Sequence, residues 1–235
     1  MRFVTMAWAA LMLAAGPAAA GAAGTSARPV VVELFTAQGC AVCLDTNQMV
    51  DDLAGRKNVI ALTYSVDYLD YLGWQDTFAK PEFTSRQRAY QQRMKLREIS
   101  TPQVVVNGRE EAPGVEADKV RELVGGGGVG RTGPTVRLLW RGSHVRIEAG
   151  RVPAGGAEVW LVRYDPTEQE VRVRTGENRG KTVSHRNVVR ELKRLGRWTG
   201  KMRTYDLPAP TAPGLKTVVM VQGANGGPIL SLARN

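Results

Sequence analysis

The two cysteines of this 235-residue chain, Cys40 and Cys43, form a single Cys-x-x-Cys motif, which constrains the fold more than any other feature. The apolar run Pro29–Thr36 before them is typical of a buried strand, and Thr46–Leu53 after them has apolar residues at helical spacing. A turn at the end of such a strand presents the first sulfur, and the following helix N-terminus stabilises a thiolate there. We therefore expect Cys40 to form a mixed disulfide and Cys43, one turn inside the helix, to resolve it.

Residues 28–124 alternate predicted strands with predicted helices. The predicted strands are Pro29–Thr36, Asn58–Val66 and Thr101–Gly108, and the predicted helices are Thr46–Leu53, Glu82–Ile99 and Gly114–Val124. Strand–helix–strand order implies right-handed crossovers and a sheet flanked by helices. The sequence therefore predicts an α/β domain over this segment.

A glycine-rich stretch at residues 125–133 is the clearest linker in the chain, and the charge changes across it. Residues 1–130 hold 13 Lys/Arg and 14 Asp/Glu, whereas residues 131–235 hold 19 and 8. Short alternating runs separated by Pro and Gly follow, which predicts a mostly antiparallel, β-sandwich-like domain over residues 134–235. Val188–Leu195 is ambiguous between strand and helix.

Residues 1–23 are predicted to be a secretory signal peptide. Arg2 supplies a positive charge, Phe3–Ala15 is an apolar stretch too short to span a membrane, and small residues then offer a cleavage site near Ala20 or Ala23. The mature protein is therefore expected in the periplasm or secreted, with no stable membrane anchor after cleavage. Its cysteines would then work in an oxidising compartment.

Three further residues are candidates for the chemistry of the cysteine pair. Pro102 opens a strand directly after Thr101; in thioredoxin-like folds, a cis-proline at this place in the order of motifs faces the Cys-x-x-Cys turn and leaves a backbone edge for an extended substrate. Glu33 lies in the strand leading to the cysteines, where a buried carboxylate would accept or supply a proton during exchange. The alternative for Glu33 is an exposed strand-end residue or a packing partner for a lysine.

An acidic, aromatic-rich insertion at Asp67–Trp74 follows the second strand. Tyr68 and Trp74 are candidates for a lid or substrate wall beside the cysteines. The alternative is a helix that packs its aromatic side onto the sheet. His185 is expected to hydrogen-bond within a loop, and two histidines are too few for most metal sites, so we predict no metal and no cofactor.

Several stretches resemble a known protein family. They are Val31–Cys43, Val66–Trp74, Phe83–Tyr90, Thr101–Arg109, Glu177-Asn178-x-Gly180 and Asn187–Arg190. Together they resemble a family of exported bacterial proteins with a thioredoxin-like fold, catalogued as domain of unknown function 1223. The resemblance spans nearly all of the mature chain and implies the fold and export, but it carries no agreed activity.

The leading hypothesis is an exported thiol–disulfide oxidoreductase that acts on protein thiols or disulfides, or on a periplasmic redox partner. Export disfavours nucleic acid as a partner. One alternative is a non-catalytic binding or assembly module of the cell envelope, in which the cysteine pair stays oxidised. Another is a Cu(I)-handling protein, because soft thiolates suit that ion.

Overall fold

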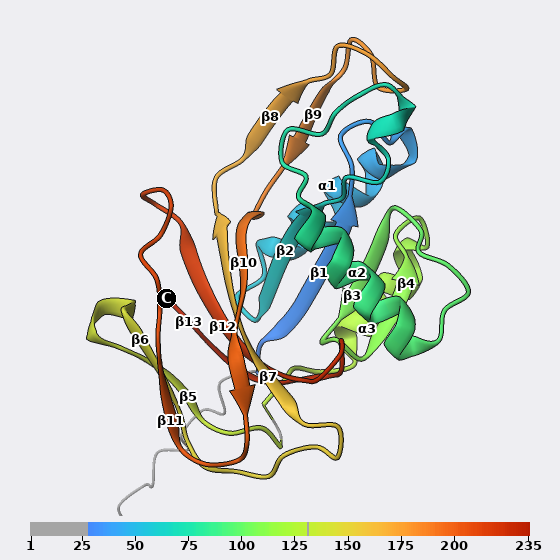
Figure 1. The fold of residues 1–235 in the computed structure, drawn as a ribbon. Helices are drawn as coiled ribbons and strands as arrows, with labels where there is room; N and C mark the ends of the chain where they lie inside the picture. Colours follow the sequence, from blue (N-terminus) through green and yellow to red (C-terminus); the bar gives the residue numbers. More distant parts are fainter. Residues whose placement is uncertain (1–27, 131) are drawn as a thin grey trace, which may run out of the picture.

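The computed structural model describes residues 28–130 and 132–235, so the predicted signal peptide lies outside the described residues. The fold is mixed α/β, built on a large and mostly antiparallel sheet (Figure 1). This sheet has eight strands in the order β13-β12-β7-β10-β2-β1-β3-β4. Within the described residues, no helix combines the length and apolar character needed to cross a membrane.

Two parallel strands form the centre of the first segment, residues 28–124; the second segment is residues 134–235. β1 (Val30–Thr36) and β2 (Val59–Ser65) are buried along their whole length, as their apolar runs predict. β3 (Gln103–Val106) pairs antiparallel with β1, and β4 (Glu110–Pro113) extends the sheet beyond it. The expected strands are therefore confirmed, and β4 is an additional strand that the sequence pattern did not reveal.

Three helices belong to this segment: α1 (Leu44–Ala54), α2 (Pro81–Met94) and α3 (Ala117–Gly125). The prediction that the second helix continues to residue 99 is wrong. Lys95 adopts a left-handed backbone conformation (φ 57°), and its N–H bonds back to the last turn of α2. Glycine usually occupies such a position, so a lysine there hides the end of the helix from sequence patterns.

The remaining strands lie after residue 133. They are β5 (Val136–Leu139), β6 (His144–Ile147), β7 (Ala157–Asp165), β8 (Gln169–Arg172), β9 (Thr182–His185), β10 (Val188–Trp198), β11 (Arg203–Asp206), β12 (Lys216–Gly223) and β13 (Ile229–Arg234). β10 resolves the ambiguous segment as a strand. Its pairing with β7 shifts register twice, and such irregularities blur the alternation of a regular strand.

Strands from both segments share the large sheet, because β10 pairs with β2 in parallel orientation through Val188 and Thr63. A three-stranded sheet, β11-β6-β5, shares an apolar core with β7 and β12. The glycine-rich stretch is bound to the fold, since the N–H of Val129 donates to the carbonyl of Pro29 (2.8 Å). The division into two domains at residues 125–133 stays a prediction.

The hairpin β8–β9 leaves the large sheet between β7 and β10 and projects beside α1 (Figure 1). Its position is anchored at the base, where the N–H of Thr63 on β2 donates to the carbonyl of Asn187 (3.1 Å). The hairpin therefore reaches the same end of the molecule as the turn between β1 and α1. That turn carries both cysteines.

Candidate functional site

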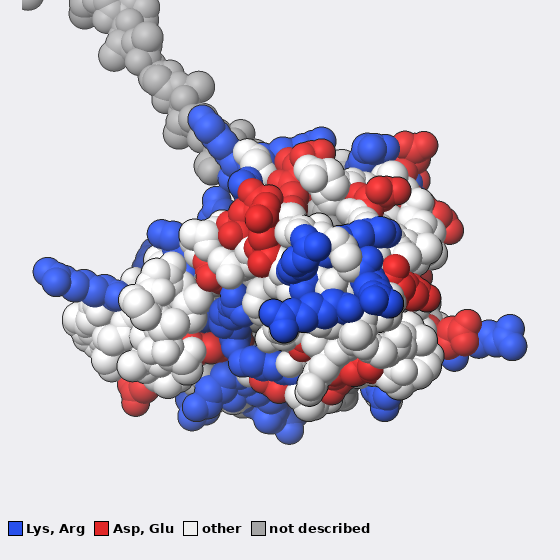
Figure 2. All heavy atoms as spheres, turned by 90° about the horizontal axis from the view of Figure 1, so that it is seen from above, with Lys and Arg blue, Asp and Glu red and all other residues white. Residues whose placement is uncertain are grey.

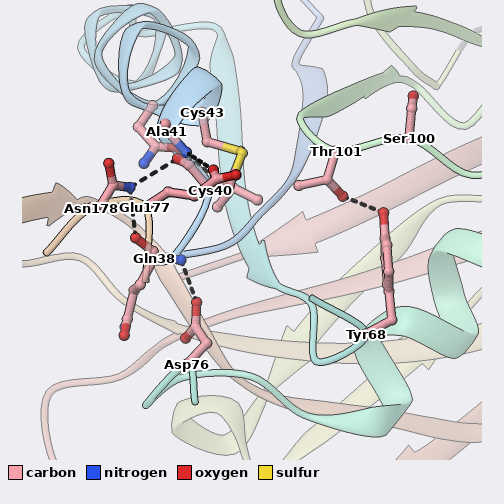
Figure 3. Close-up of a disulfide and its surroundings, with 12 residues drawn as sticks. Gln38, Cys40, Ala41, Cys43, Tyr68, Asp76, Ser100, Thr101, Glu177 and Asn178 are labelled. Carbon is pink, nitrogen blue, oxygen red and sulfur yellow. Dashed lines mark hydrogen bonds between the residues drawn. A yellow bond between two sulfur atoms is a disulfide. The ribbon is translucent and has the colours of Figure 1, made fainter. Parts of the chain in front are cut away.

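The cysteine pair lies at the start of the first helix, as the sequence predicts. A 3-10 turn, η1 (Ala41–Cys43), runs directly into α1, and Cys40 is its N-terminal cap residue. Cys40 and Cys43 are joined in a disulfide (Figure 3). The first sulfur is not presented to solvent, however: Cys40 is only 4% exposed and Cys43 is 0% exposed, whereas Val42 between them is 62% exposed.

The tip of the β8–β9 hairpin covers the cysteine turn. The side-chain amide of Asn178 donates to the carbonyl oxygens of Gln38 (2.9 Å) and Cys40 (3.0 Å), and Asn178 is completely buried. The N–H of Ala41 donates to a carboxylate oxygen of Glu177 (3.1 Å). These contacts join residues nearly 140 positions apart in the chain, and they hold the hairpin tip against the cysteine turn (Figure 3).

Gln38 connects the cysteine turn to the loop after β2. Its backbone N–H donates to Asp76 (2.7 Å), and its side-chain oxygen accepts from the indole N–H of Trp74 (2.9 Å). Burial raises the pKa of Asp76 to about 6, although the amides of Gln38 and Phe78 donate to this carboxylate. Trp74 therefore supports the cysteine turn through the buried side chain of Gln38. Sequence patterns had not indicated a role for Gln38.

Thr101 and Tyr68 belong to the surroundings of the disulfide drawn in Figure 3. The hydroxyls of these two residues hydrogen-bond to each other, and burial raises the pKa of Tyr68. The Thr101–Pro102 bond is cis, as expected. Pro102 and the first turns of α1 approach closely around Gly114, where an added Cβ would lie 2.6 Å from the Thr46 methyl and 2.9 Å from the proline ring.

The aromatic insertion is a loop rather than a continuous helix. Its only regular element in the described structure is a 3-10 turn, η2 (Asp70–Leu72). Tyr68 and Trp74 are each half-buried and directed into the protein by the hydrogen bonds above. The insertion therefore forms one wall around the cysteine turn, and its role in substrate binding stays a prediction.

Glu33 is fully buried and paired with a cation from α2. Its carboxylate accepts from Nε (2.7 Å) and Nη2 (3.1 Å) of Arg86, and from the hydroxyl of Tyr90. Arg86 also donates to Gln222 on β12 (3.2 Å), so the network connects both segments of the chain. Among the described residues, the Glu33 carboxylate accepts hydrogen bonds from Arg86 and Tyr90, and it makes none with the cysteines.

A second buried polar group lies one helical turn after Cys43. Asn47 accepts from the hydroxyl of Thr36 (2.8 Å), and its amide lies 3.4 Å from Nδ1 of His185. His185 belongs to β9 rather than to a loop, and burial lowers its pKa to about 4, so the imidazole is neutral at neutral pH. In the part of the chain that the structure describes, no three His, Cys, Asp or Glu side chains gather as a metal site would require.

Comparison with protein families identifies what this chain is related to. The family described as "Protein of unknown function (DUF1223)" matches residues 31–222, a range that includes every side chain discussed above. The chain belongs to this family. No curated protein matches it. The match therefore confirms the family to which the sequence motifs point, a domain of unknown function.

Among the solved structures that match the DUF1223 chain, two differ widely in how much of it they cover. The structure of protein AGR_C_4864 from Agrobacterium tumefaciens is 28% identical, covers 89% of this chain and 94% of its own, and superposes with a TM-score of 0.68. An endonuclease/exonuclease/phosphatase from Beutenbergia cavernae DSM 12333 is 16% identical over 41% of this chain and 21% of its own, with a TM-score of 0.17. The second likeness is too low to carry any argument, whereas the first extends over nearly the whole fold.

Proposed function

We propose that this protein is an exported thiol–disulfide oxidoreductase whose N-terminal segment is a thioredoxin-like domain. The observation that carries the proposal is the placement of the Cys40–Cys43 disulfide at the N-terminus of a helix, directly after a buried strand. A helix N-terminus lowers the pKa of a cysteine thiol, which makes the thiolate a better leaving group and a more abundant nucleophile.

The reaction follows from the two sulfurs alone. In the reducing direction, the Cys40 thiolate attacks a substrate disulfide, forms a mixed disulfide and releases one substrate thiolate. The Cys43 thiolate then attacks the Cys40 sulfur, which restores the protein disulfide and releases the second substrate thiolate. Two electrons pass from the protein to the substrate, and the reverse sequence donates the disulfide.

The neighbouring residues supply roles around these sulfurs. Thr101 and Pro102 are proposed to hold the substrate chain, with Tyr68 and Trp74 forming the wall of the site. Glu33 takes no part in the proposed proton transfers, because its carboxylate is already paired with Arg86 in the core. The exposed Val42 gives a partner protein an apolar contact next to the disulfide.

The proposed partners are protein thiols or disulfides, or a redox partner in the same exported compartment. Figure 2 shows the molecule from above the end that carries the β8–β9 hairpin, where Lys and Arg side chains gather in the middle of the face with Asp and Glu among them. The hairpin and its loop contribute exposed cations: Arg172, Arg174, Arg179, Lys181 and Arg186. This charge favours partners with an acidic surface.

The second candidate function is a non-catalytic envelope module with a permanent disulfide, and the burial of both sulfurs favours it. Trapping a mixed disulfide separates the two. Mature protein carrying Cys43→Ser should form a stable mixed disulfide with a model peptide disulfide, because Cys40 attacks and no thiol resolves it. The matched Cys40→Ser variant should form little, because Cys43 is completely buried. Equal and negligible adduct from both variants, together with no catalysis of peptide oxidation or reduction by the wild type, would overturn the proposal.

A further inference from the structure

We infer that Glu177 is a redox-linked positioning residue: its carboxylate holds the β8–β9 hairpin over the disulfide, and the Cys40 thiolate displaces it when the disulfide is reduced. The inference deepens the proposed thiol–disulfide exchange and rests on it. It assigns the hairpin, which belongs to the second segment of the chain, a role in the chemistry of the first.

The carboxylate occupies the position that a thiolate needs. Glu177 accepts from the N–H of Ala41, which is the first residue of η1 and directly follows Cys40. The free N–H groups at a helix N-terminus are the groups that stabilise an anion there. In the oxidised protein Cys40 carries no charge, so the carboxylate binds this end of the helix without competition.

Reduction places a second anion at the same helix end. The Cys40 thiolate and the Glu177 carboxylate then repel each other and compete for the same N–H groups. Charged residues nearby include Lys181, whose ammonium donates to the Asn178 side chain (3.2 Å), and Asp45, in the first turn of α1. One cation and one further anion leave the repulsion between Cys40 and Glu177 largely uncompensated. Glu177 therefore favours the oxidised state of the pair.

One contact of the hairpin tip breaks easily, whereas the two hydrogen bonds from buried Asn178 have to break before the tip can move. Glu177 is solvent-exposed, so water can replace its bond to Ala41. The hairpin tip also contacts the aromatic insertion. The hydroxyl of Thr175 donates a hydrogen bond to the carbonyl of Gly73, and Gly176 lies close to Leu72. The strands behind the tip are only four residues long. Outward movement of this tip frees the Ala41 N–H and loosens the cysteine turn, whose sulfurs lie on the side toward Thr101 (Figure 3).

Reduction of the Cys40–Cys43 disulfide is an ordinary thiol–disulfide exchange. A dithiol reductant attacks the Cys40–Cys43 bond, is itself oxidised to a disulfide, and delivers two electrons to the two sulfurs. Cys43 takes up one of the two protons of the dithiol and the other goes to solvent, so Cys40 remains a thiolate at the helix end. The Glu177 carboxylate then leaves the Ala41 N–H and is hydrated. The hairpin tip opens as the two Asn178 hydrogen bonds to the cysteine turn also break.

The test compares Glu177→Gln with a matched control, Glu170→Gln, which neutralises an exposed glutamate on β8 of the same hairpin. We expect Glu177→Gln to speed reduction by dithiothreitol about tenfold and to shift the equilibrium with glutathione about tenfold toward the dithiol, or about 30 mV. The control should match the wild type in both measurements. Hydrogen exchange at the amides of Ala41 and residues 175–181 should accelerate when the wild type is reduced.

Two results would overturn the inference. One is a Glu177→Gln variant whose reduction rate and equilibrium match those of the wild type. The other is unchanged hydrogen exchange at the hairpin tip after reduction. Failure of the proposed function looks different: a wild-type potential below about −300 mV and no catalysis would mark a structural disulfide, even if Glu177→Gln still shifted that potential.

Discussion

The buried pair of Glu33 and Arg86 allows a quantitative test of how the two segments are held together. The guanidinium makes two hydrogen bonds to the carboxylate (2.7 and 3.1 Å), and the two side chains are 0% and 4% exposed. Removing one partner of such a pair leaves an uncompensated buried charge, which costs about 3–5 kcal/mol of unfolding free energy. We predict losses of this size for Glu33→Leu and for Arg86→Met separately.

The double variant should lose far less than the sum of the two single variants. Without either charge, Tyr90 and Gln222 still hydrogen-bond to each other (3.0 Å), so the remaining loss is about 1–2 kcal/mol. Guanidinium chloride unfolding of the oxidised protein at neutral pH, followed by far-UV circular dichroism, measures all four free energies. Additive losses in the double variant would refute the buried charge pair. The double variant should also keep the wild-type rate of disulfide reduction, since the Glu33 carboxylate hydrogen-bonds to Arg86 and Tyr90 and to neither cysteine.

Three further predictions concern residues around the site. Burial lowers the pKa of His185 from 6.5 to about 4, so the unfolded chain takes up a proton at a higher pH than the folded protein. The free energy of unfolding of the wild type should therefore fall by about 3 kcal/mol from pH 7 to pH 4 because of this residue. His185→Gln should lack that part of the fall in denaturant titrations. The raised pKa of Asp76 has the opposite effect on stability, which is lost as pH rises through about 6. The NMR resonance of the Gln38 amide should titrate near that pH, because this amide donates to the Asp76 carboxylate. Persistence of this titration in Asp76→Asn would contradict the assignment. Gly114→Ala should cost about 1–3 kcal/mol of unfolding free energy, because its Cβ would lie 2.6 Å from a methyl carbon of α1. Gly125→Ala, at the end of α3 with open space around it, should unfold at the wild-type denaturant concentration or slightly above it.

Local patterns in the sequence predicted much of the first segment. β1 and β2 are continuous apolar runs, and α1 follows the cysteines with helical spacing, so each element is determined by neighbouring residues. The cysteine pair at the strand–helix turn was predictable for the same reason. The end of α2 was not, because Lys95 takes a backbone conformation that its side chain does not favour.

The covering of the site could not be predicted from local patterns. Asn178 and Glu177 approach the cysteine turn only because β10 joins the edge of β2 and carries the hairpin with it. Pairing between strands so distant in the chain leaves no periodic trace in either strand. Glu177 and Asn178 belong to a stretch that resembles a family motif, but their contacts with the cysteine turn depend on the tertiary fold. The same limit applies to Glu33, whose partner Arg86 lies 53 residues away.

The reduction potential of the Cys40–Cys43 disulfide tests the proposed function most directly. Mature wild-type protein is equilibrated against mixtures of reduced and oxidised glutathione, and the dithiol fraction is measured by thiol alkylation and mass spectrometry. An exchange protein should give a potential between about −270 and −120 mV. A potential below about −300 mV would contradict the proposal, because the disulfide would then be a structural bond beneath the β8–β9 hairpin.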